Sequence, residues 1–158
     1  MKDIFDSQLI LGLSARHIIV MLGGLCLMLA PFLVWSAYWD AGKEHVIYGI
    51  ETQREFGASG MVIFLFLGIA SVLGGFIASR VSNIKNEKLL LFLGALTGIA
   101  GLLALIITTV QAEIAMVSIG TSFMNNTGIG WYAALTGSML ILFATLIPKV
   151  RTLPGNER

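Results

Sequence analysis

Histidine and carboxylate side chains are the groups in this chain that could support cofactor or metal chemistry. The two histidines are His17 and His45, and a long apolar stretch separates them. A haem or metal ion held by histidine needs its ligand rings around one point in space. Because an apolar stretch of that length crosses a bilayer, we expect the two rings on opposite sides of a membrane. The sequence therefore predicts no cofactor, and His17 is interpreted as a residue at the membrane surface.

Four carboxylates gather in one segment near His45. They are Asp40, Glu44, Glu51 and Glu55. Such a group could attract cations, but its spacing does not repeat that of the oxygen ligands in a calcium-binding loop. We interpret it as a solvated acidic loop and predict no metal site. Asp40 and Glu113 are the acids closest to the expected membrane surface, where a cation or a basic partner loop would bind first.

Motifs for nucleophilic catalysis and for phosphate binding do not occur in the sequence. It has no Ser–His–Asp arrangement, no glycine-rich phosphate loop and no nucleic-acid signature. The single cysteine, Cys26, excludes an internal disulfide and a thiol redox pair. We therefore predict no catalytic residue, no enzyme activity and no nucleic-acid partner.

Four apolar stretches determine the class of protein. They run from His17 to Trp39, Gly60 to Ser79, Lys88 to Val110 and Gly130 to Pro148, without a charge in their interiors. About 20 apolar residues cross the hydrocarbon core of a bilayer. Only 12% of the 158 residues are charged, against roughly 25% in soluble domains. We predict an all-α integral membrane protein: one domain, residues 1–158, built as a four-helix antiparallel bundle within the lipid bilayer.

The four stretches also contain no histidine apart from His17, the first residue of the first stretch. Proton pumps, rotor rings and ion-coupled transporters keep an ionisable group at membrane depth, because it is costly there and retained only for function. The sequence therefore argues against these classes of protein.

Basic residues indicate the orientation of the chain. Those expected on the cytoplasmic side are Lys2, Arg16, Arg80, Lys85, Lys88, Lys149, Arg151 and Arg158. Only Lys43 and Arg54 fall in the other two loops. Cytoplasmic loops are enriched in Lys and Arg, so we expect both termini in the cytoplasm and loops 40–59 and 111–129 outside. The predicted location is the plasma or cytoplasmic membrane.

The two ends of the chain lie outside the apolar stretches. Asp3 and Asp6 stand where a signal peptide would be basic, so we expect no cleaved leader. The first 16 residues form either an amphipathic helix on the inner membrane surface or a frayed tail. The apolar residues of that helix would be Ile4, Phe5, Leu9, Ile10 and Leu13. The polar tail after Pro148 is expected to be disordered.

Aromatic residues mark the outer ends of two stretches. These expected interfacial anchors are Trp35, Tyr38, Trp39, Trp131 and Tyr132. Pro31 lies inside the first stretch and removes a backbone hydrogen bond, which predicts a kink near Met28–Ala30.

The two outer loops contain enough apolar residues to pack. Residues 45–51 and 113–120 are the runs that favour extended structure. We expect a small extracytoplasmic cap in which these two short β segments pair with each other, the alternative being two irregular loops.

Small residues recur at helical spacing within the stretches. Gly94 and Gly98 form a G-x-x-x-G pattern that Gly101 continues. The other members are Ala70, Gly74 and Ala78, Ser71 and Gly75, and Gly137. Small side chains let helix backbones approach closely. The pattern serves either a surface for an oligomer or partner subunit, or packing within the chain's own bundle.

The general plan resembles that of tetraspan proteins such as claudins, with tryptophans at the start of a longer first outer loop. The motif of that group also needs two loop cysteines, which this chain lacks, so no family is assigned. We expect a non-catalytic accessory or structural subunit of a larger membrane complex or a homo-oligomer. The alternative is an oligomeric channel or carrier for a small neutral solute, lined by Thr97, Thr136 and Ser138. A lipid-directed enzyme would have to use outer residues such as Asp40 and His45, and is the least supported hypothesis.

Overall fold

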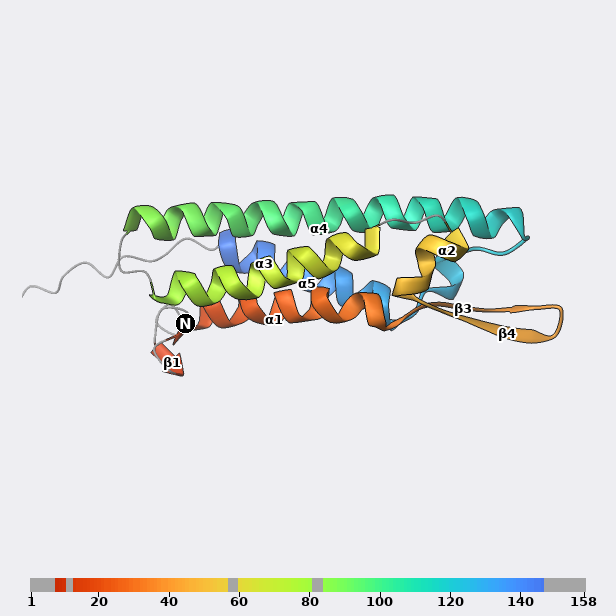
Figure 1. The fold of residues 1–158 in the computed structure, drawn as a ribbon, viewed down its shortest axis with the longest axis horizontal. Coiled ribbons are helices and arrows are strands. Elements are labelled where there is room, and N and C mark those ends of the chain that lie inside the picture. Colours follow the sequence, from red (N-terminus) through yellow and green to blue (C-terminus); the bar gives the residue numbers. More distant parts are fainter. Residues whose placement is uncertain (1–7, 11–12, 57–59, 81–83, 147–158) are drawn as a thin grey trace, which may run out of the picture.

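The computed structural model describes residues 8–10, 13–56, 60–80 and 84–146 (Figure 1). Within the N-terminal segment, β1 (Gln8–Ile10) pairs antiparallel with β2 (Leu13–Ser14). Of the two alternatives for the first 16 residues, the amphipathic helix is therefore wrong for Gln8–Ile10 and Leu13–Ser14. Residues 1–7 and the tail after Pro148 lie outside the described residues.

Within the described residues, four helical segments have the length and composition needed to cross a membrane: α1 (Ala15–Leu29), which a short turn extends to Phe32, α3 (Gly60–Arg80), α4 (Ile84–Ser118) and α5 (Ile129–Leu146). They run alternately up and down, so the bundle is antiparallel (Figure 1). We call the end where α1 begins and α5 finishes the terminal end, and the opposite end the cap end. The predicted membrane class is thus supported by the length and composition of these helices.

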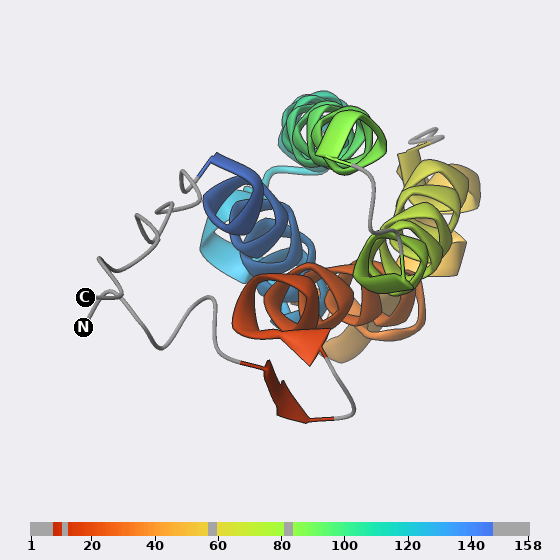
Figure 2. The ribbon, with the colours of Figure 1, turned by 90° about the vertical axis from the view of Figure 1, so that its left-hand side faces the viewer.

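The helices form a four-membered ring. Helix α1 packs against α3 and α5, and α4 packs against the other side of both. The view along the bundle shows α1 and α4 at opposite corners (Figure 2). Glycine pairs stand where α1 crosses its neighbours: Gly24 meets Gly68 of α3, and Gly23 meets Gly137 of α5. With no side chains between them, the backbones approach closely enough for dispersion to hold the helices together.

The first span is shorter than the apolar stretch predicted. Helix α1 ends at Leu29, Pro31 lies in the 3-10 turn Ala30–Phe32, and the chain continues as strand β3 (Val34–Asp40). Proline lacks a backbone N–H, and its ring clashes with the carbonyl four residues earlier. Here it ends the helix instead of kinking it. The predicted helical span to Trp39 is therefore wrong beyond Phe32.

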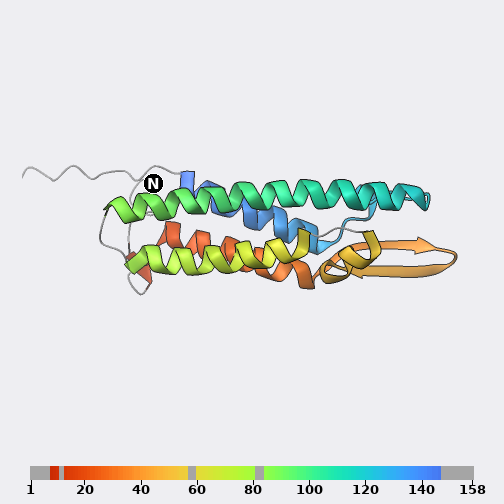
Figure 3. The same ribbon diagram turned by 45° about the horizontal axis from the view of Figure 1, so that its top comes forward.

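Strand β3 forms a hairpin with β4 (Lys43–Tyr48) in antiparallel register, with Tyr38 opposite His45. The turn residues Ala41 and Gly42 have φ of 48° and 80°. Positive φ at both positions is the conformation of a type I′ hairpin turn, whose twist matches that of the strands. Figures 1 and 3 show the hairpin extending beyond α1 and α3 at the cap end.

The predicted cap does contain a β segment, but the predicted pairing of the two outer loops is wrong. Residues 45–48 are extended as expected, but their partner is β3. The second expected strand, 113–120, lies mostly in α4, which continues to Ser118. At 1.5 Å per residue, the 35 residues of α4 span about 52 Å, so the helix extends past a bilayer core of about 30 Å. The second outer segment joins the hairpin through the bridge from Ser36 to Thr127 and through the contact of Ser36 Oγ with Met116 Sδ at 3.6 Å.

A compact core closes the cap end. Trp35 is fully buried, its ring centroid lies 5.7 Å from that of Phe64, and its Nε1 donates to the carbonyl of Ala30 at 2.6 Å. Met116 and Phe123 are also fully buried in this cluster. Short elements complete the cap, namely the 3-10 turns Gly49–Glu51 and Met124–Asn126 and helix α2 (Thr52–Phe56).

Candidate functional site

The G-x-x-x-G pattern of α4 packs inside the chain. A Cβ at Gly94 would lie 2.7 Å from Cγ2 of Thr145, and one at Gly98 would lie 2.6 Å from Cγ of Leu142. A Cβ at Gly101 would overlap the hydroxyl of Ser138. These contacts, all to α5, assign the pattern to packing within this bundle.

The small residues of α3 divide between two environments. Gly75 faces Met21 of α1, where a Cβ would lie 2.9 Å from its Cγ, and Ala78 is buried. At Gly74, by contrast, a Cβ would meet no described atom within 4 Å. Ala70, one turn away, is exposed. The face of α3 at Ala70 and Gly74 is therefore uncovered, whereas Gly75 and Ala78 are buried.

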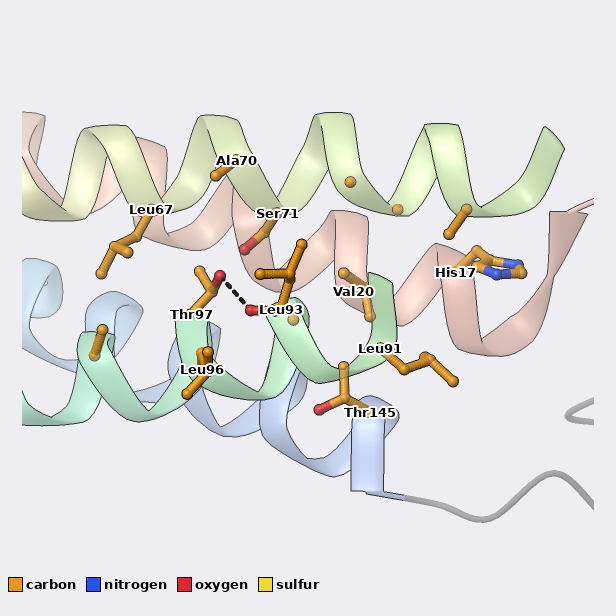
Figure 4. Close-up of a pocket in the computed structure, with 15 residues that line it drawn as sticks. His17, Val20, Leu67, Ala70, Ser71, Leu91, Leu93, Leu96, Thr97 and Thr145 are labelled. Atoms are coloured by element: carbon orange, nitrogen blue, oxygen red, sulfur yellow. Dashed lines mark hydrogen bonds between the residues drawn. The ribbon is translucent and has the colours of Figure 1, made fainter. Parts of the chain in front are cut away.

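That open face borders a cavity of about 390 Å³ in the half of the bundle nearer the terminal end (Figure 4). All four long helices contribute to its lining, α3 and α4 most of all. The lining residues that matter for its chemistry are His17, Ser71, Gly74, Gly94, Thr97 and Thr145. The remaining lining is aliphatic, so the site is a mainly apolar pocket with a few polar groups.

The hydroxyl groups in the lining differ in their hydrogen bonds. Thr97 Oγ1 donates to the carbonyl of Leu93 at 2.8 Å, and Thr145 Oγ1 donates to that of Ile141 at 2.8 Å. Ser71 Oγ is buried and has no hydrogen-bond partner among the residues that the structure describes. Serine and threonine in membrane helices ordinarily bond back to their own helix, so Ser71 departs from the pattern of the other two.

The residues expected to line a channel do not come together. Thr97 lines the cavity, whereas Thr136 is exposed on α5. Ser138 is fully buried and donates to the carbonyl of Ala134 at 2.9 Å. The predicted polar lining is therefore distributed over different faces of the bundle.

The aromatic residues expected as anchors occupy different environments. Trp35 is a core residue, and Tyr38 is partly buried and stacks on His45 at 5.3 Å between ring centroids. Trp39 is 72% exposed on the hairpin. Trp131 donates from Nε1 to Thr109 Oγ1 at 2.8 Å and makes a T-shaped contact with the exposed Tyr132. The contact of Trp39, Trp131 and Tyr132 with lipid headgroups stays a prediction.

Two of the outer acids have local structural partners. Glu51 accepts a hydrogen bond from the backbone N–H of Tyr48 at 3.1 Å, and Glu113 accepts one from that of Met124 at 3.1 Å. Within the described ranges, no group of three His, Cys, Asp or Glu side chains could hold a metal ion. Glu51 and Glu113 therefore stabilise turns of the cap.

Comparisons with protein-family models, with curated proteins and with solved structures found no match to this chain.

Proposed function

We propose that this chain is a non-catalytic membrane protein that works by contact, as an accessory or structural subunit of a larger membrane complex or of a homo-oligomer. The observation that supports this proposal is an uncovered apolar face on the hairpin β3–β4, at the cap end of the bundle.

Alternation along the strands defines that face. Val46 and Tyr48 point to one side of β4, and the buried Ile47 points to the other. Ala37 pairs with Val46, so Trp39, two residues further along β3, joins the same side. The exposed fractions are 72% for Trp39, 42% for Val46 and 45% for Tyr48. These three residues form what we call the hairpin face, and Glu44, the partner of Trp39 in the register, lies on the same side.

The position of the hairpin face relative to the long helices indicates its role. Apolar exposure on the long helices is expected in lipid, but the hairpin extends beyond α1 and α3 (Figure 3). Trp39 is five residues after Val34, about 17 Å further along the strand. Aromatic side chains exposed outside a membrane span are typical of protein interfaces, where tryptophan and tyrosine are enriched. A second membrane subunit, or a second copy of this chain, is the partner we propose for Trp39, in place of the lipid headgroups expected from the sequence.

Photo-crosslinking in native membranes tests the proposal. A photoreactive phenylalanine analogue at Trp39 should give a covalent adduct with a protein, whereas the same group at Tyr38, on the opposite side of the strand, should not. An adduct of twice the 17.0 kDa chain mass indicates a homo-oligomer, and any other protein mass indicates a separate subunit. Adducts with lipid alone, together with a monodisperse monomer after gentle detergent extraction, would contradict the proposal.

The alternative, an oligomeric channel or carrier for a neutral solute, needs a continuous polar route. Only one of its three expected lining residues, Thr97, borders the cavity. We therefore retain the proposal that the chain works by binding a partner subunit. Solute flux through liposomes containing the protein would reverse this choice.

The orientation proposed for the chain places the hairpin outside the cell and both termini in the cytoplasm. Its support is the distribution of Lys and Arg along the sequence.

A further inference from the structure

The cavity between the long helices has an opening toward the outer surface of the bundle. Ala70 of α3 and Leu96 of α4 both line the cavity and are exposed. Gly74, one turn after Ala70 on α3, also borders open space, since no described atom lies within 4 Å of where its Cβ would be. The outer surface of such helices faces hydrocarbon in a bilayer. A molecule dissolved in the membrane can therefore reach the cavity sideways.

The hydroxyl of Ser71 is a polar group at this site that the described fold leaves without a hydrogen-bond partner. Its side chain is 3% exposed, and it faces Thr97 of α4 across the cavity (Figure 4). Buried hydroxyl groups in proteins nearly always have a hydrogen-bond partner. Because Ser71 Oγ has none among the described residues, the arrangement indicates an acceptor supplied from within the cavity.

The lining restricts the charge of the ligand. None of the 15 lining residues is Asp, Glu, Lys or Arg, and His17 alone among them can titrate. Ser71 is nine residues before Arg80, the last residue of α3, so it lies about 13 Å deeper along the helix. A charged headgroup at that depth would lose its hydration without gaining a partner of opposite charge. The ligand is therefore uncharged near Ser71.

We propose that the cavity binds one neutral, membrane-soluble lipid. Its hydrocarbon chain lies against the small residues Ala70 and Gly74, and its uncharged oxygen, a hydroxyl or carbonyl, accepts a hydrogen bond from Ser71. The volume of about 390 Å³ falls in the range of roughly 300–1,000 Å³ typical of small-molecule sites. The site is independent of the hairpin face, which lies at the other end of the bundle.

Photolabelling of the purified protein in phosphatidylcholine nanodiscs tests this proposal. The probe is hexadecanol with a photoreactive diazirine in its chain, and adducts are located by mass spectrometry. We expect adducts on residues of α3 and α4 that line the cavity. Unlabelled hexadecanol should compete about three- to tenfold better than hexadecane, the ratio expected for one neutral hydrogen bond.

Two variants separate the site from general lipid contact. Gly74→Leu places a side chain in the cavity and should reduce labelling to background, whereas Thr136→Leu, at an exposed position on α5 outside the lining, should leave labelling unchanged. Ser71→Ala should make hexadecanol compete no better than hexadecane. Its unfolding temperature without the alcohol should stay the same or rise, because no hydrogen bond within the described fold is lost. Thr136→Ala is its matched control.

Three results would overturn the proposal. The first is equal labelling of the unaltered protein and Gly74→Leu. The second is equal competition by alkane and alcohol in the unaltered protein. The third is a Ser71→Ala variant that unfolds at a lower temperature while its competition ratio is unchanged, which would make Ser71 a structural residue.

Discussion

Gly23 and Gly137 bring α1 and α5 into direct backbone contact. A Cβ added at Gly23 would lie 2.7 Å from the carbonyl oxygen of Gly137, and one added at Gly137 would lie 2.7 Å from that of Gly23. The crossing depends on the absence of both side chains. A matched contrast is Gly74 of α3, where an added Cβ meets no described atom within 4 Å.

We predict that Gly23→Ala destabilises the bundle by about 1–3 kcal/mol, since a rigid backbone atom must move to admit the methyl group. Gly74→Ala should change the free energy of unfolding by no more than about 0.5 kcal/mol. Equilibrium unfolding in mixed detergent micelles measures both. Equal stability of the two variants would mean that the α1–α5 crossing is looser than described.

The two tryptophans of β3 should differ strongly in their effect on stability. Trp35→Ala removes a fully buried ring and its hydrogen bond to Ala30, and should cost about 3–5 kcal/mol. Trp39→Ala removes a 72% exposed side chain and should cost less than about 0.5 kcal/mol in the isolated protein. Thermal unfolding followed by circular dichroism gives the comparison, and similar losses for both would contradict the placement of Trp35 in the core.

One substitution should stabilise the hairpin turn. Ala41 adopts φ of 48°, a left-handed conformation in which a Cβ costs roughly 1 kcal/mol. Ala41→Gly should therefore slow hydrogen exchange of the β3 and β4 amides, and Gly42→Val, at φ of 80°, should accelerate it. Faster exchange in Ala41→Gly would show that the loss of backbone entropy outweighs the relief of strain.

Cysteine labelling tests the proposed orientation. In a Cys26→Ala background, Lys43→Cys in the hairpin should react with a membrane-impermeant maleimide in intact cells. Ser82→Cys, between α3 and α4, should react only after permeabilisation, because the basic residues flanking it favour the cytoplasmic side. The opposite labelling pattern would invert the topology.

Hydropathy predicted the long helices correctly, but it also predicted a helix for the segment after the first one, which is a strand. The segment from Val34 to Trp39 is apolar and aromatic, which suits a membrane helix and a buried strand equally. Pro31 decides between them, since the helix cannot continue through it without losing a hydrogen bond. Residues 113–118 show the reverse error: a strand was expected there, but α4 continues through them and buries Met116 in the cap core.

The small-residue pattern could be found from the sequence, but its partners could not. Gly98 and Gly101 pack against α5, whereas a Cβ at Gly74 would meet no described atom within 4 Å, although all three looked alike in sequence. Apart from the presence of the two glycines, nothing in the sequence predicted that Gly24 would pack against Gly68.

The apolar pattern of the sequence is enough to predict four helices suited to a bilayer, because a backbone in hydrocarbon must satisfy its hydrogen bonds internally and a helix does so locally. Tertiary structure alone decided which face of each helix meets a neighbour. That choice depends on how all four helices rotate and pack together, and it leaves Ser71 turned into a cavity and Trp39 uncovered on the hairpin.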